Sequence, residues 1–187
     1  MKIQKLTEKL HALHLKAMAD IIEETLKKAA VDNLSPADAF LILADHQIEQ
    51  RKQKLIKARI SQAAFPTVKT IDAFDFNFPK SVHKSKILSL FDLQFVHGKQ
   101  NIILMGPPGT GKTHIAIALG YQACQAGIKT LFTTAMNLIN HLSASLADNS
   151  FLKTMKSYKS PPLLIIDELG YLPVDKQGAE LLFQVIS

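Results

Sequence analysis

The sequence predicts an α/β fold with a parallel sheet, preceded by a small all-α N-terminal region. A short apolar run, NIILM (101–105), leads directly into GPPGTGKT (106–113), and HIAIALGYQACQAG then continues at helical spacing. Two further runs, TLFTTA (130–135) and PPLLIIDEL (161–169), have the length and composition of buried strands. The helical region is predicted because residues 1–64 lack glycine and repeat apolar residues at helical spacing.

The composition is typical of a folded protein in a reducing compartment. The 187 residues are 47% hydrophobic, enough to bury a core, and their formal net charge of +6 permits an acidic polymer as partner. The single cysteine, Cys124, excludes an internal disulfide. No secretory signal pattern and no apolar run of about 20 residues occurs, so we expect a cytoplasmic protein without a membrane segment.

Residues 1–64 are expected to form the helical N-terminal domain. Ser35, Pro36 and Asp38 indicate a helix start, with serine as N-cap, proline at the first helical position and an acid in the first turn. From there one helix can run to about Gln62. Its far half is basic, and its cations form either a solvated helix end or a contact surface for nucleic-acid phosphates: Arg51, Lys52, Lys54, Lys57 and Arg59.

The segment 65–79, FPTVKTIDAFDFNFP, is expected to be a linker or extended arm, because prolines flank it and it lacks helical periodicity. The alternation of Phe74, Phe76 and Phe78 places three rings on one side of an extended chain. Two interpretations stay open: the rings cover the core of the next domain, or one ring borders a nucleotide base. That next domain is expected to span residues 80–187.

GPPGTGKT has the spacing of a P-loop, or Walker A motif, between a predicted strand and a predicted helix. Its glycines let successive backbone N–H groups form an anion nest at a helix N-terminus. Lys112 can reach the β- and γ-phosphates of ATP, and the Thr113 hydroxyl can ligate Mg²⁺. The residues predicted to bind the ATP phosphates are Gly106, Pro107, Pro108, Gly109, Thr110, Gly111, Lys112, Thr113 and His114.

Two acids, Asp167 and Glu168, stand at the end of the third predicted strand. Ligands of open α/β sheets bind at the carboxyl ends of the strands. Asp167 can hold the Mg²⁺ shell, as in a Walker B motif, and Glu168 can polarise a water for attack on the γ-phosphate. The P-loop lies 54 residues earlier, counted from Thr113 to Asp167, so the two motifs support one magnesium–nucleotide site.

Three segments together, GPPGTGKTHIAIALGYQA, LLIIDELGYLP and GAELLFQVIS, resemble the IstB-like helper ATPases of insertion-sequence transposons. These proteins are close relatives of the bacterial replicative helicase loader within the AAA+ superfamily. The resemblance covers nearly the whole chain, and LGYLP after the acid pair is its most family-selective part. It implies a three-layer α/β/α AAA+ core with an incomplete parallel sheet, preceded by the small all-α domain of the family.

The resemblance also implies an activity and partners. Members of the family bind DNA without strong sequence preference, oligomerise with ATP and assist a transposase encoded alongside them. By that analogy the glycine loop with Lys112 and Thr113 binds phosphate and Mg²⁺, Asp167 is the magnesium residue, and Glu168 activates water. An extra helical insertion precedes the Walker B strand in related AAA+ proteins, and residues 136–161 occupy that place. Three lysines within it are either a solvated helix face or contacts to DNA: Lys153, Lys156 and Lys159.

The C-terminal part departs from the family pattern. The chain ends 19 residues after Glu168, whereas the resemblance implies a further sensor strand and an arginine finger. The only two arginines, Arg51 and Arg59, precede the P-loop. We therefore expect a truncated copy that binds ATP but hydrolyses it slowly, because such a finger contributes on the order of 10³–10⁵ in rate. A replicative helicase loader and a non-functional remnant stay open as alternatives to a transposition helper.

Overall fold

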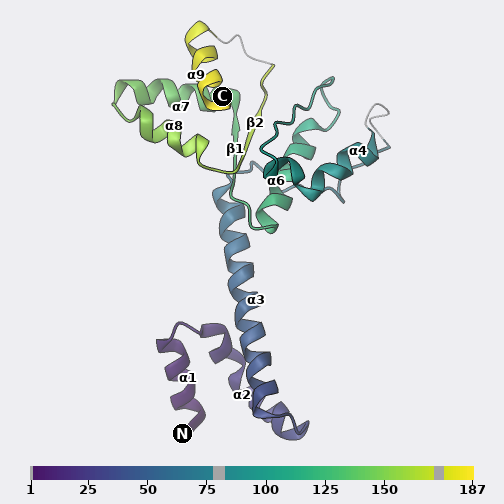
Figure 1. Ribbon diagram of the computed structural model, residues 1–187, viewed down its shortest axis with the longest axis vertical. Coiled ribbons are helices and arrows are strands. Elements are labelled where there is room, and N and C mark those ends of the chain that lie inside the picture. Colours follow the sequence, from purple (N-terminus) through teal and green to yellow (C-terminus); the bar gives the residue numbers. More distant parts are fainter. Residues whose placement is uncertain (1, 78–82, 171–174) are drawn as a thin grey trace. The chain divides into compact units, whose positions relative to one another are not determined.

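A computed structural model describes residues 2–77, 83–170 and 175–187 (Figure 1). Phe78 and the tripeptide 171–173 of the LGYLP motif lie outside the described residues. The chain divides into two compact units, Met1–Lys57 and Ala58–Ser187. This division falls inside one helix and does not test the domain boundaries predicted near residues 64 and 79, which stay predictions.

The first unit consists of helices and the turns that join them. Helix α1 spans Lys2–Ala12, α2 spans Lys16–Val31, and α3 begins at Pro36 and continues to Gln62. A small apolar core joins the three helices through Leu10, Met18, Ala19, Ile22 and Leu43. The buried side chain of Gln47 adds a polar contact, because its Oε1 accepts a hydrogen bond of 3.3 Å from the backbone N–H of Met18.

The predicted start and end of α3 are confirmed. The Ser35 Oγ accepts a hydrogen bond of 3.2 Å from the backbone N–H of Asp38, and the Asp38 carboxylate accepts one of 3.2 Å from the backbone N–H of Ser35. These reciprocal bonds form a capping box, which satisfies two N–H groups that a helix start leaves unpaired. A serine N-cap of this kind typically contributes about 1 kcal/mol to the stability of a helix.

The second unit contains a parallel pair of strands with helices around it (Figure 1). Strand β1 (Thr130–Thr134) pairs with β2 (Leu163–Asp167) from Thr130↔Leu163 to Thr134↔Asp167, which confirms the second and third predicted strands. Short helical segments α4 (Lys84–Leu88), η1 (Ser89–Asp92) and α5 (Gln94–His97) precede the glycine loop. The helices around the strands are α6 (Lys112–Gln125), α7 (Ala135–Ala147), α8 (Phe151–Lys159) and α9 (Lys176–Ile186).

The two strands have helices on both sides. Helix α6 contacts both strands, and Gly120 on it lies so close to Ile165 that an added Cβ would be 2.6 Å from the Ile165 Cδ1. On the other side, the core of α7, α8 and α9 includes Leu138, Leu142 and Leu181, and Leu164 and Ile166 of β2 pack against it. The strand alternation therefore places Ile165 toward α6 and its two neighbours toward α7–α9.

The strand predicted at residues 101–105 is not present. The side chains of Ile103 and Met105 are 77% and 87% exposed, and no described strand pairs with this segment. A buried strand needs a neighbouring strand for its N–H and C=O groups as well as an apolar sequence. The prediction used the apolar sequence alone. In the structure no described strand pairs with this segment, and it leads into the glycine loop without regular structure.

None of the helices in the described ranges is both long enough and apolar enough to cross a membrane.

Candidate functional site

The glycine loop ends at the start of α6, where the sequence predicted it. Gly109 and Gly111 have left-handed backbone conformations, with φ of 76° and 83°, which residues with a Cβ rarely adopt. The Lys112 ammonium lies across the loop and donates hydrogen bonds to the carbonyl oxygens of Gly106 at 2.9 Å and Pro107 at 2.8 Å. The loop thus has a local cation beside the N-terminus of a 14-residue helix, a combination that favours anions.

The segment before the core packs on this loop. The Phe74 ring lies so close to Gly111 that a Cβ added there would be 2.3 Å from the Phe74 Cε2. The same ring is edge-on to the His114 imidazole at 5.3 Å, and the His114 Nε2 is 2.9 Å from the carbonyl oxygen of Thr70. Phe74 therefore covers the start of α6, and Phe76 packs on Phe74 at 4.8 Å.

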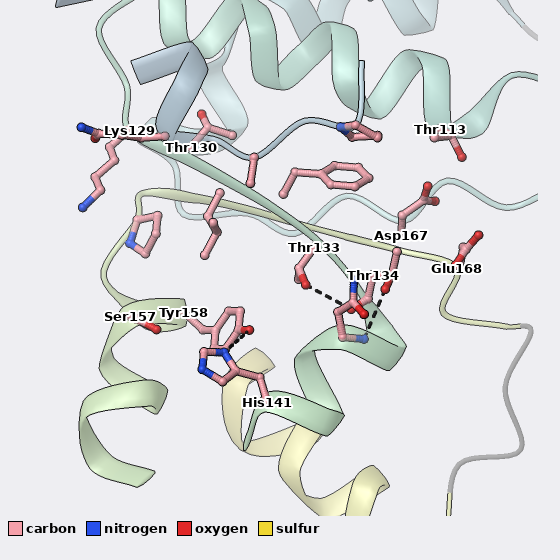
Figure 2. Close-up of a pocket in the computed structure, with 17 residues that line it drawn as sticks. Thr113, Lys129, Thr130, Thr133, Thr134, His141, Ser157, Tyr158, Asp167 and Glu168 are labelled. Carbon is pink, nitrogen blue, oxygen red and sulfur yellow. Dashed lines mark hydrogen bonds between the residues drawn. The ribbon is translucent and has the colours of Figure 1, made fainter. Parts of the chain in front are cut away.

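A pocket of about 890 Å³ brings the two sequence motifs together. Thr113 from the start of α6 lines it with Asp167, the last residue of β2, and Glu168, the next residue (Figure 2). Figure 2 shows these three side chains at one end of the pocket. Glu168 has a φ of 61°, a left-handed conformation that is uncommon for a residue with a side chain and ends the strand at this point.

The pocket has a polar wall that sequence reasoning missed. Thr134 and Asn137 at the start of α7 line it, and the Thr134 Oγ1 accepts a hydrogen bond of 3.2 Å from the Asn137 backbone N–H. Further along, the His141 Nδ1 and the Tyr158 Oη are 2.9 Å apart, and burial raises the pKa of Tyr158. The only sequence signal was the position of threonines at the end of a predicted strand, where ligands bind.

The predicted phosphate-binding residues are not all brought to this pocket. Thr113 is the only one of the nine that lines it, and Lys112 is hydrogen-bonded within its own loop. Among the described residues, no three His, Cys, Asp or Glu side chains gather in a way that could hold a metal ion by themselves. A magnesium ion at Thr113 and Asp167 would therefore need ligand oxygens from water and from a phosphate, which is how proteins commonly bind it.

None of the residues predicted to contact DNA lines the pocket. Arg51, Lys52, Lys54 and Lys57 are exposed on α3, whereas Arg59 is half-buried, with its Nη1 3.9 Å from the place of a Cβ at Gly127. On α8, Lys153, Lys156 and Lys159 are exposed, and the Lys159 Nζ donates a hydrogen bond of 3.1 Å to the carbonyl oxygen of Gln184. Lys159 is therefore partly engaged within the chain, and Arg59 is less accessible than the other predicted contacts.

A family model for IstB-like ATP-binding proteins matches residues 8–187, nearly the whole chain. The chain belongs to this IstB-like family. A protein of insertion sequence IS5376 from Geobacillus stearothermophilus, described as ATP-binding, is 38% identical over 98% of this chain and 73% of its own length. Corresponding proteins of IS232 from Bacillus thuringiensis and IS21 from Pseudomonas aeruginosa are 36% and 34% identical, over 73% and 67% of their lengths.

Membership of the IstB-like family confirms the resemblance inferred from the three sequence segments. It places the chain among proteins of insertion sequences. The comparisons concern the chain as a whole and assign no role to an individual residue, so the roles of Lys112, Thr113, Asp167 and Glu168 stay predictions.

Proposed function

We propose that this IstB-like protein binds ATP with Mg²⁺ at its glycine loop and acts as a DNA-binding helper of an insertion-sequence transposase. The observation that carries the nucleotide part is the pocket itself. It joins Thr113 with Asp167 and Glu168, which lie 54 and 55 residues further along the chain, next to the loop that holds Lys112. Hydroxyl and carboxylate ligands for Mg²⁺, beside an anion-binding loop, are what ATP–Mg²⁺ requires.

Each residue has a distinct task in this proposal. The N–H groups of the loop and the Lys112 ammonium bind the phosphates, and Lys112 exchanges its bonds to the Gly106 and Pro107 carbonyls for phosphate oxygens. Thr113 and Asp167 provide the protein ligands of Mg²⁺. Glu168 orients a water and accepts its proton when the water attacks the γ-phosphate.

We further propose a three-layer AAA+ core from about residue 80, preceded by an all-α domain and a linker at 65–79. Helices on both sides of β1 and β2 support the layered core. The exposed lysines of α3 and α8 and the net charge of +6 support contacts to DNA phosphates. The insertion-sequence origin of its relatives supports a transposase as the protein partner.

Steady-state turnover tests the assignment of Glu168. The Glu168→Gln variant keeps the shape of the side chain but removes the base, so it should still bind ATP while phosphate release falls at least about tenfold. Equal phosphate release by wild type and variant would reject Glu168 as the base.

A further inference from the structure

Helix α3 carries an apolar stripe that no described part of the chain covers. Leu41, Ile48 and Leu55 are 58%, 64% and 55% exposed, although they are large aliphatic residues. They recur every seven residues on a helix of 27 residues, almost four heptads. Leu43 and Gln47, which face the core of the first unit, lie on another face of the helix, about 80–160° around it from the three stripe residues at ~100° per residue. Exposed aliphatic residues that recur at heptad spacing on one helix face form a candidate interaction surface.

The residues between them complete a heptad pattern. Taking Leu41, Ile48 and Leu55 as a positions, the d positions are Ala44, Arg51 and Ala58. We infer that this α3 stripe pairs with the α3 stripe of a second copy of the chain in an antiparallel coiled coil. The inference goes beyond the proposed function: it names a surface for self-association that does not require bound nucleotide.

Side-chain size favours the antiparallel direction. In that arrangement each a residue faces a d residue, so Leu41 of one copy meets Ala58 of the other, and Leu55 meets Ala44. Both leucines then pack against an alanine methyl group, so that large and small residues meet in these layers of the seam. A parallel pair would instead stack leucine on leucine and alanine on alanine, which leaves gaps at the alanine layers.

Charge favours the same direction. The e positions next to the stripe include Asp45 and Lys52. In the antiparallel register, Asp45 of each copy lies beside Lys52 of the other copy, so the dimer has two such pairs related by the twofold axis. Both side chains are exposed and make no salt bridge within the described chain. A parallel pair would instead bring Lys54 next to Arg59, two cations that repel.

Arg51 is compatible with the seam. It would face Ile48 of the second copy, and its guanidinium is turned aside, where Nη2 lies 3.5 Å from the carbonyl oxygen of His14. The aliphatic stem can then contact isoleucine while the charged group stays in water.

Sedimentation of the whole chain without nucleotide tests the pairing. At about 50 µM we expect a dimer, and Ile48→Glu should raise its dissociation constant at least about tenfold. Leu152→Glu is the matched control, since Leu152 is 82% exposed on α8, and it should leave the dimer intact. A wild-type monomer at this concentration would overturn the inference. A protein that stays monomeric and binds only an added transposase through α3 would also overturn the inference, and it would assign the stripe to that partner.

Two charge variants and two cysteine variants test the direction. Asp45→Lys and Lys52→Asp should each weaken the dimer. The double variant should restore it, because position 45 of one copy then carries the cation and position 52 of the other copy carries the anion.

In a Cys124→Ala background, Ala44→Cys with Leu55→Cys should form an intermolecular disulfide, whereas Ala44→Cys alone should not. Cross-linking by Ala44→Cys alone would show a parallel pair and overturn the antiparallel register.

The nucleotide site and the stripe can fail separately. Lys112→Ala should remove ATP binding and leave the dimer unchanged, whereas Ile48→Glu should leave ATP binding unchanged. A dimer that dissociates in Lys112→Ala would overturn the assignment to α3.

Discussion

Gly111 has two constraints at one position. Its φ of 83° is left-handed, and a Cβ there would be 2.3 Å from the Phe74 ring. The Gly111→Ala variant should therefore lose about 2–4 kcal/mol of stability, from backbone strain and overpacking together. Urea denaturation measures the loss. Gly170→Ala is the control, since no described atom lies within 4 Å of its Cβ position, and it should change stability by less than about 1 kcal/mol.

Cys124 is a buried thiol and should be inert in the folded protein. Its side chain is fully buried, and burial raises the pKa of the thiol above its ordinary value. A raised pKa lowers the thiolate fraction at pH 8, and the thiolate is the reactive form. Alkylation by iodoacetamide at pH 8 should be at least about tenfold slower in native than in urea-unfolded protein. Similar rates in both states would contradict the burial.

The capping box of α3 is a local element with a measurable contribution. Ser35→Ala removes the hydroxyl that accepts from the Asp38 N–H and should cost about 1 kcal/mol. Ser61 is an exposed serine near the other end of the same helix. The Ser61→Ala variant changes the composition equally and should lower the stability much less. Thermal unfolding followed by circular dichroism compares them, and equal losses would show that the cap contributes nothing specific.

Elements set by neighbouring residues could be predicted from the sequence. Ser35, Pro36 and Asp38 predicted the start of α3 because the cap bonds are local. The strand at 101–105 was predicted wrongly, since a strand also depends on partners elsewhere in the chain. The contact of Phe74 with Gly111 could not be predicted, because it depends on how a segment without periodicity folds back on the loop.

The same distinction holds for the candidate site. The pairing of Thr113 with Asp167 followed from two motifs whose spacing and context have known chemistry. The wall formed by His141 and Tyr158 carries no motif, and its two residues come together only through the packing of α7 on α8.

For the whole molecule, the basic residues of α8 test DNA binding. Changing Lys153, Lys156 and Lys159 to Glu should weaken duplex binding similarly for all sequences and reduce its salt dependence, by up to about 0.9 in log–log slope per lost phosphate contact. The control changes three exposed lysines of α1 and α2, Lys9, Lys16 and Lys28, to Glu and alters the net charge equally. Equal weakening by both sets would show a general charge effect and reject the α8 surface.

The central proposal is that the glycine loop binds ATP, and equilibrium binding of ATP with Mg²⁺ to the whole chain measures it most directly. Isothermal titration of wild type and Lys112→Ala should show binding in the first and a loss of at least about tenfold in the second, because the variant removes a charge-assisted contact to the phosphates. Circular dichroism should confirm that both are folded. Equal affinity of the two folded proteins, or no binding by wild type, would contradict the proposal.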